Sequence, residues 1–205
     1  QIPYFLTANH CIKSNAAARN LELFWNYTAT NGNGSCSGPG APMTMGATVK
    51  AASGKGDFTL LELNDSPPDG SVFMGWTSAE VATVSDELLH RVHHPKGAPQ
   101  SYTTHVTDPS FGTCGGLPIP QFIYSLDTLG STEGGSSGSL VTNDAGEVVG
   151  QLYGGCGSNF DECFSDDWRT VDGAFSFYFD KVSEFLAAPS CEPSPEICDD
   201  GDDNN

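Results

Sequence analysis

The chain has 205 residues, with 26 acidic against 8 basic side chains and a formal net charge of −18. This charge argues against a nucleic-acid partner, which would need a basic face. No run of 18 apolar residues is present, so we expect no membrane-spanning helix and no membrane partner. The length fits one domain with a sizeable core. We interpret the charge as a solvated acidic surface, with attraction of basic substrates as the alternative.

Cysteine usage indicates an oxidising compartment, because a chain of this size holds seven cysteines: Cys11, Cys36, Cys114, Cys156, Cys163, Cys191 and Cys198. Their spacing with histidine is not typical of zinc ligands, so we expect no metal and no other cofactor. A bond from Cys156 to Cys163 would close a short loop, and one from Cys191 to Cys198 could staple the tail. Spacing does not fix these pairings.

Alternation of apolar and polar residues predicts many short strands separated by turn signals. In chain order they cover residues 4–8, 21–27, 45–51, 58–63, 72–76, 80–84, 88–94, 102–106, 121–126, 140–142, 147–153 and 173–179. Residues 15–20 favour a helical turn, and a late helix is predicted from Asp180 toward Pro189. This pattern indicates an all-β barrel or sandwich with a C-terminal helix.

A glycine-rich segment at residues 134–140 carries the first sign of chemistry. Glycines on both sides of adjacent serines let the backbone turn sharply and point several amides in one direction, as a nucleophile with an oxyanion hole requires. A flexible linker is the alternative for this segment taken alone.

A serine nucleophile needs a base and a group that orients the base. His10 follows the first predicted strand, and Asp57 opens the mostly apolar strand at residues 58–63. A carboxylate at that position needs a partner if it is buried. The sequence therefore offers a histidine, an aspartate and a serine, although an isolated aspartate at a strand start is often only a turn residue.

The order histidine, aspartate, serine, with separations of 47 and 80 residues, resembles the chymotrypsin-like serine proteases, and most closely their bacterial lysyl endopeptidase branch. The resemblance rests on residues 7–11, 57–63 and 135–139, supported by residues 24–27, 75–76, 93–95, 132–137 and 150–155. It implies two six-stranded antiparallel β-barrels with a C-terminal helix, and strands ahead of His10 that are missing here. The protease domain would cover residues 1–188. In the family, the partner of the cysteine matching Cys11 lies on such a preceding strand.

The resemblance implies a role for each matching residue. Ser137 would be the nucleophile, His10 the general base and Asp57 the orienting carboxylate, with the amides of Gly135 and Ser137 as the oxyanion hole. Substrate would be bound by Ser131, Thr132, Leu152, Tyr153 and Gly154, the last three by strand addition. The implied protein is a secreted, monomeric bacterial serine endopeptidase that acts on polypeptides through an acyl-enzyme and needs no cofactor.

Three positions depart from the family pattern. Trypsin-like enzymes hold an aspartate where this chain has Ser131, and the lysyl endopeptidase branch holds one where it has Thr170. A preference for basic residues is expected only through a nearby acid; Asp172, Asp166 and Asp167 are the candidates. Ser136 replaces the aspartate that anchors a new N-terminus in trypsin-like zymogens, so we do not expect activation by that salt bridge.

Two other functions stay open at this point. One is a catalytically impaired binding protein on the same fold. The other is a calcium-dependent surface module, because residues 189–205 are rich in acids, proline and cysteine. We interpret this tail as a disordered acidic linker to a further module, through which the protein could be attached to the cell surface.

Overall fold

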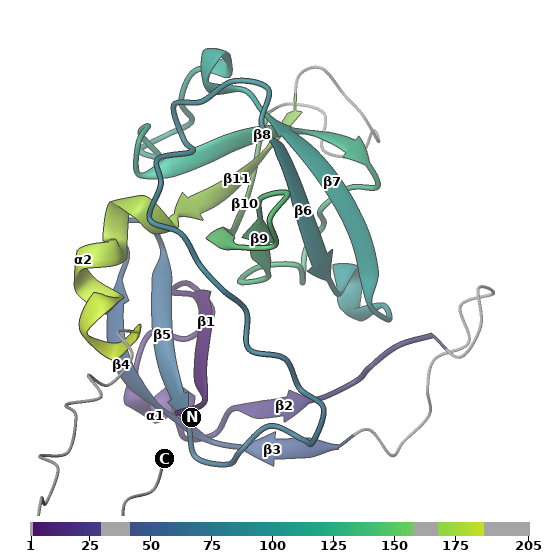
Figure 1. Ribbon diagram of the computed structural model, residues 1–205, viewed down its shortest axis with the longest axis vertical. Helices are drawn as coiled ribbons and strands as arrows, with labels where there is room; N and C mark the ends of the chain where they lie inside the picture. The colour runs from purple at the N-terminus through teal and green to yellow at the C-terminus, as the bar shows by residue number, and fades with distance from the viewer. Residues whose placement is uncertain (1, 30–41, 158–167, 187–205) are drawn as a thin grey trace, which may run out of the picture.

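A computed structural model describes residues 2–29, 42–157 and 168–186 (Figure 1). The tail at residues 189–205 and the cysteines Cys36, Cys163, Cys191 and Cys198 lie outside the described residues. No helix within these ranges is long and apolar enough to cross a membrane.

Six strands form a closed antiparallel barrel in the C-terminal half. Around the barrel they follow the order β10 (Val148–Gly157), β11 (Trp168–Ala174), β8 (Phe122–Leu129), β7 (Ser101–Thr107), β6 (Leu88–His93) and β9 (Leu140–Thr142). Short 3-10 turns at Pro95–Gly97 and Pro109–Phe111 connect some of them. Closure removes free edges and gives a rigid frame for the loops between strands.

The N-terminal half holds a three-stranded antiparallel sheet and a small hairpin (Figure 1). The sheet has the order β1 (Tyr4–Ala8), β5 (Phe58–Leu63) and β4 (Ala47–Ser53); the hairpin pairs β2 (Glu22–Phe24) with β3 (Met43–Met45). A single turn of helix, α1 (Asn15–Ala18), precedes the hairpin. The predicted double-barrel class is confirmed, with one barrel closed and the other present in part.

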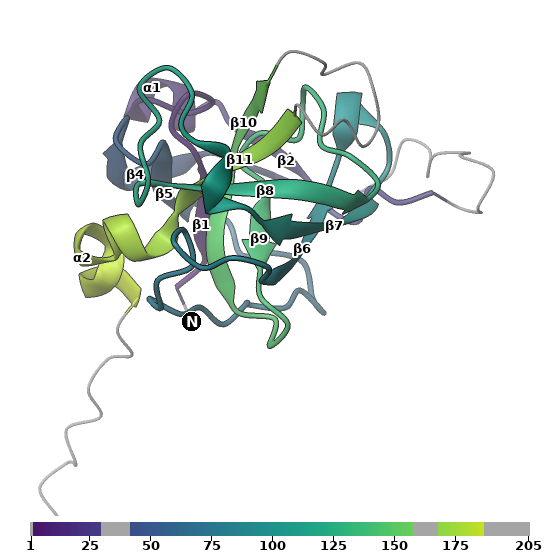
Figure 2. The same cartoon turned by 90° about the horizontal axis from the view of Figure 1, so that it is seen from above.

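The last helix begins earlier than the sequence predicts. Residues 173–179 were expected as an aromatic strand, but β11 ends at Ala174 and α2 (Phe175–Leu186) begins at once. Aromatic residues favour strands, yet Phe175, Tyr178 and Val182 recur at helical spacing and are all buried. Figure 2 shows α2 beside β4 and β5, where this face packs on Phe58.

Two further predicted strands are wrong. Residues 72–76 and 80–84 form an irregular connection between the two halves, with only one isolated bridge, from Trp76 to Val148. Val72 is 86% exposed, so its apolar character does not reflect a buried face. Val81 and Ala82 are buried against the barrel core without strand pairing, which explains the apolar signal there.

The suggested disulfide from Cys156 to Cys163 is also wrong, because Cys156 bonds Cys114. The bond joins β10 to the loop before β8, a loop that the sequence left uninterpreted. Cys11 is exposed and has no disulfide partner among the described residues. Burial, followed by the nearby Asp57 carboxylate, raises the pKa of the Cys11 thiol.

Candidate active site

His10 and Asp57 form a close pair at the junction of the two halves. The Asp57 Oδ2 oxygen lies 2.6 Å from His10 Nδ1, and its Oδ1 accepts the His10 backbone amide at 2.8 Å. The carboxyl group is almost buried, whereas the His10 side chain is 37% exposed. Because a carboxylate only accepts, Nδ1 carries the proton and Nε2 is the basic nitrogen.

Asp57 is held by the backbone conformation around it and by the C-terminal half. Its φ is +48°, and its carbonyl accepts the amide of Asn9 at 2.8 Å. Gln151 on β10 donates from its side-chain amide to the carbonyls of Gly56 and Asp57, at 2.9 and 3.1 Å. Tyr178 on α2 donates its hydroxyl proton to the side-chain oxygen Oε1 of Gln151. A buried side chain thus ties the strand entrance at Asp57 to the barrel and to the last helix.

The serine loop, defined here as residues 131–139, packs against the end of β1. A Cβ atom added at Gly138 would lie 2.8 Å from the amide of Ala8, so only glycine allows this approach. Gly138 also donates its amide to the carbonyl of Leu152 at 2.8 Å, and Leu152 donates to Ser139 at 2.9 Å. Ser137 is therefore carried on a turn that lies against the strand leading to His10.

The amides of residues 135–139 divide into two sets. Those of Ser136, Gly138 and Ser139 donate to backbone carbonyls. Those of Gly135 and Ser137 have no acceptor among the residues that the structure describes. Gly135 has a φ of +96°, which favours glycine and helps to turn the loop. An oxyanion hole requires unpaired amides of this kind beside the nucleophile.

Beyond Leu152, strand β10 has one open edge. Among the residues that the structure describes, Gly154 and Gly155 pair with β11 only, after a bulge between Leu152 and Gly154. The Tyr153 ring lies edge-on to His10, with 5.6 Å between ring centroids. Both backbone groups of Leu152 already bond the serine loop, so Tyr153 and Gly154 are the predicted edge residues left to pair with a ligand backbone.

A second histidine–aspartate pair lies inside the barrel. His105 Nδ1 is 2.7 Å from Asp127 Oδ1, and both side chains are buried. The Thr170 hydroxyl donates to the same oxygen at 2.7 Å, and the Thr132 amide donates to Oδ2 at 3.3 Å. Burial raises the pKa of Asp127, but the hydrogen bonds from His105, Thr170 and Thr132 outweigh it and hold that pKa below its usual value.

Asp172, one of the acids predicted near the pocket, is occupied elsewhere. Its Oδ1 oxygen accepts from Arg91 at 2.6 Å, and both side chains are fully buried. Arg91 also donates to the carbonyl and hydroxyl of Ser139 at 2.9 and 3.1 Å, which fixes the end of the serine loop. The other candidates, Asp166 and Asp167, lie outside the described residues.

Ser136, at the zymogen-aspartate position, bonds a histidine. Its hydroxyl accepts the Glu133 amide at 3.3 Å and hydrogen-bonds His93 Nδ1 at 2.7 Å. Burial, then the positive charge of Arg91, lowers the pKa of His93 to about 4. A neutral histidine therefore holds the serine loop where trypsin-like enzymes use an ion pair.

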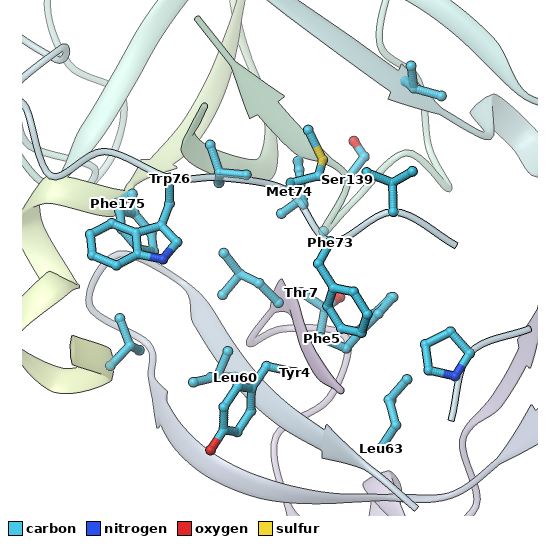
Figure 3. A pocket seen from close by; sticks show the side chains of 18 of the residues that line it. Tyr4, Phe5, Thr7, Leu60, Leu63, Phe73, Met74, Trp76, Ser139 and Phe175 are labelled. Carbon is cyan, nitrogen blue, oxygen red and sulfur yellow. The ribbon is translucent and has the colours of Figure 1, made fainter. Parts of the chain in front are cut away.

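A cavity of about 1380 Å³ borders the serine loop, and its lining includes Gly135 and Ser137. Figure 3 shows its apolar lining, which includes Phe5, Leu60, Phe73, Met74 and Trp76. His10, Asp57 and Tyr153 do not line it. The cavity therefore reaches Ser137, the candidate nucleophile, but not the His10–Asp57 pair.

Comparison with known proteins agrees with this arrangement. Residues 1–168 match the family described as "Lysyl endopeptidase, C-terminal domain". The lysyl endopeptidase of Pseudomonas aeruginosa is 32% identical over 197 residues, which cover 89% of this chain and 40% of the relative. This chain belongs to the lysyl endopeptidase family. It spans 40% of the length of that relative.

A solved structure supports the fold of this family member. The inactivated protease paralogue S-I1 of the scabies mite matches with a TM-score of 0.61 and 14% identity, over 89% of this chain and 83% of that one. At this identity the likeness concerns the fold alone. The family and the double-barrel class inferred from the sequence are confirmed.

Sequence reasoning missed the roles of four residues whose hydrogen bonds hold Asp57 and the serine loop: Gln151, Tyr178, His93 and Asp127. A signal for Asp127 was present, because polar residues alternate along β8 and β11 on the face that points into the barrel: Ser125 and Asp127, Thr170 and Asp172. An inward polar stripe in a closed barrel requires partners. The partners themselves, from β6, β7 and the serine loop, depend on strand order.

Proposed function

We propose that this protein is a secreted serine endopeptidase that cleaves polypeptides through an acyl-enzyme and prefers a basic residue, above all lysine, before the scissile bond. The supporting observation is the His10–Asp57 pair at the end of β1, against which the loop carrying Ser137 packs. Membership of the lysyl endopeptidase family supports the same reaction class. Extracellular location is part of the proposal, supported by the Cys114–Cys156 bond.

Each residue then has a defined step. Ser137 attacks the carbonyl carbon of the scissile bond, and its proton passes to Nε2 of His10. Asp57 keeps the proton on Nδ1 and stabilises the imidazolium that forms. The proton is next delivered to the leaving amine, which departs and leaves the acyl group on Ser137. Water, deprotonated by His10, then releases the acid product and restores Ser137.

The unpaired amides of Gly135 and Ser137 would stabilise the oxyanion in both tetrahedral intermediates. Their positions are fixed before substrate arrives, because the neighbouring amides of Ser136 and Gly138 are already bonded. Preorganised donors of this kind lower the barrier by about 3 kcal/mol each. An extended substrate would pair its backbone with Tyr153 and Gly154 at the open edge of β10.

The choice of Ser137 among three neighbouring serines also has a physical basis. Ser136 is 1% exposed, and its hydroxyl is bonded to His93. The Ser139 hydroxyl accepts from the buried Arg91. Ser137 is half-buried and has no hydroxyl partner among the described residues, which leaves its oxygen available.

Labelling with a fluorophosphonate probe tests the proposal. We expect the wild-type protein to be labelled, Ser137→Ala to lose labelling, and Ser139→Ala, on the same loop, to keep it. Cleavage of a denatured protein substrate should follow the same pattern. A folded wild-type sample that is neither labelled nor active would overturn the proposal and favour a binding protein on this fold.

A further inference from the structure

Thr170 stands where the family resemblance implies an aspartate, and its hydroxyl donates to the buried carboxylate of Asp127. Thr170 lies on β11 opposite Gly155 of β10, next to the open edge at Gly154. Its hydroxyl contacts the Thr132 hydroxyl at 2.8 Å, and Thr132 lies on the serine loop five residues before Ser137. The two hydroxyls thus join the strand beside the substrate edge to the loop that carries the nucleophile.

The direction of every hydrogen bond in this group is fixed. A carboxylate only accepts, so Thr170 donates its one hydroxyl proton to Asp127 Oδ1. The Thr170 oxygen must then accept the proton of Thr132. Once that proton is used, the Thr132 oxygen presents lone pairs only. A group that bonds the outer end of this chain must therefore be a donor.

Among the described residues, no lysine or arginine forms an ion pair with the Asp127 carboxylate at the inner end. Within residues 2–29, 42–157 and 168–186, the only ion-pair partner of Asp127 is His105. Arg91 lies with its Nε 3.4 Å from His105 Nε2, but its charge is already matched by Asp172.

We propose that Asp127, acting through Thr170 and Thr132, selects a lysine side chain before the scissile bond. This inference rests on the proposed function. Thr132 is partly exposed, whereas Thr170 and Asp127 are buried, so the ammonium group meets the Thr132 oxygen rather than the carboxylate. In this arrangement the acid lies on β8 rather than on β11. The hydroxyls of Thr170 and Thr132 connect it by hydrogen bonds to the substrate side chain.

The test compares two peptide substrates that differ only before the scissile bond, one with lysine and one with norleucine, which lacks the ammonium group. The ratio of their kcat/KM values is measured within each variant, so it does not depend on the active fraction. We expect Thr132→Val and Asp127→Asn to lower the lysine-to-norleucine ratio by about 10- to 100-fold. The first variant removes the oxygen that accepts from the substrate ammonium group, and the second removes the negative charge that attracts it.

Two further variants separate selection from folding. Thr132→Ser retains the hydroxyl and should restore most of the ratio. Thr104→Val removes a threonine–threonine hydrogen bond of the same length, to Thr128 on the exposed side of the barrel, and should leave the ratio unchanged. If Asp127→Asn does not fold, Thr132→Val and Thr132→Ser decide the matter.

The outcomes distinguish the two proposals. A wild-type protein that is not labelled by fluorophosphonate contradicts the proposed function. A labelled wild-type protein that shows no preference for lysine, or keeps it in Thr132→Val, overturns the role of Asp127 and leaves the protease assignment intact. In that case the acids at residues 158–167 become the next candidates.

Discussion

The molecule contains two histidine–aspartate pairs of nearly equal geometry and opposite setting. Nδ1 of His10 lies 2.6 Å from Asp57, and Nδ1 of His105 lies 2.7 Å from Asp127. The side chain of His10 is 37% exposed, whereas that of His105 is fully buried. The pairs therefore cannot be told apart by the bond between their members. They differ in what the second ring nitrogen meets.

In the buried pair, Nε2 of His105 is taken by Arg91 and by the Thr103 hydroxyl at 2.9 Å. In the other pair, Nε2 of His10 has no hydrogen-bond partner among the described residues. The same two side chains thus form a structural pair where both ring nitrogens are hydrogen-bonded. They form a candidate catalytic pair where the second ring nitrogen has no hydrogen bond. A carboxylate beside a histidine is not by itself a sign of catalysis.

The strongest test of this comparison replaces each histidine in turn. His10→Ala should lower kcat/KM by about 10⁴-fold or more. Its free energy of unfolding should change by less than about 1 kcal/mol, since the side chain is partly exposed. His105→Gln should show the reverse balance, with a loss of about 3 kcal/mol in stability, because Asp127 loses its buried partner. Denaturant unfolding and peptide hydrolysis measure both quantities.

The comparison fails if His105→Gln is fully stable, or if His10→Ala retains activity. The first result would mean that the barrel interior tolerates an unpaired carboxylate. The second would mean that another base serves Ser137. Both variants are assayed at a temperature where each is folded, so that activity is not confused with loss of the native state.

A third histidine sharpens the comparison, because His93 is buried without a carboxylate partner. Its pKa is about 4 in the folded protein, against about 6.5 when unfolded. As pH falls from about 6.5 to about 4, the His93 side chain binds a proton in the unfolded chain but stays neutral in the native state. The native state therefore loses up to about 3 kcal/mol relative to the unfolded chain across this window.

The measurement is the free energy of unfolding between pH 7 and pH 4 in the wild type and in His93→Gln. Acidic side chains titrate in both proteins, so the difference between the two curves isolates the histidine. We expect the variant to lose less stability over this range. Parallel curves would show that His93 is protonated without penalty, contrary to the burial that lowers its pKa.

Local pattern was enough to predict His10 and Asp57 as candidates, whereas the family resemblance selected Ser137 among neighbouring serines. Strand β5 was predicted with its observed bounds. The support beneath them could not be read in this way. Gln151 meets Asp57 across 94 residues and Arg91 meets Asp172 across 81, and such contacts depend on strand order around the barrel. The start of α2 was missed because local aromatic propensity opposed the helical spacing that tertiary packing rewards.

The smallest expected effect concerns how the reactive pair is held in place. Tyr178→Phe removes the hydroxyl that bonds Gln151, which in turn holds the carbonyls of Gly56 and Asp57. Loss of one buried hydrogen bond should cost about 1 kcal/mol in stability. If Gln151 then shifts, Asp57 should orient His10 less well, and kcat should fall several-fold, whereas KM should change little.

The control is Tyr124→Phe, which removes a tyrosine hydroxyl that donates to Leu117 and accepts the amide of Cys114. Its stability should fall by at least as much, because two hydrogen bonds are lost, while kcat stays at the wild-type value. Equal kcat values in the two variants would show that Gln151 keeps its place without Tyr178. The position of Asp57 would then depend on its own backbone, with its positive φ and the bond to Asn9, rather than on the last helix.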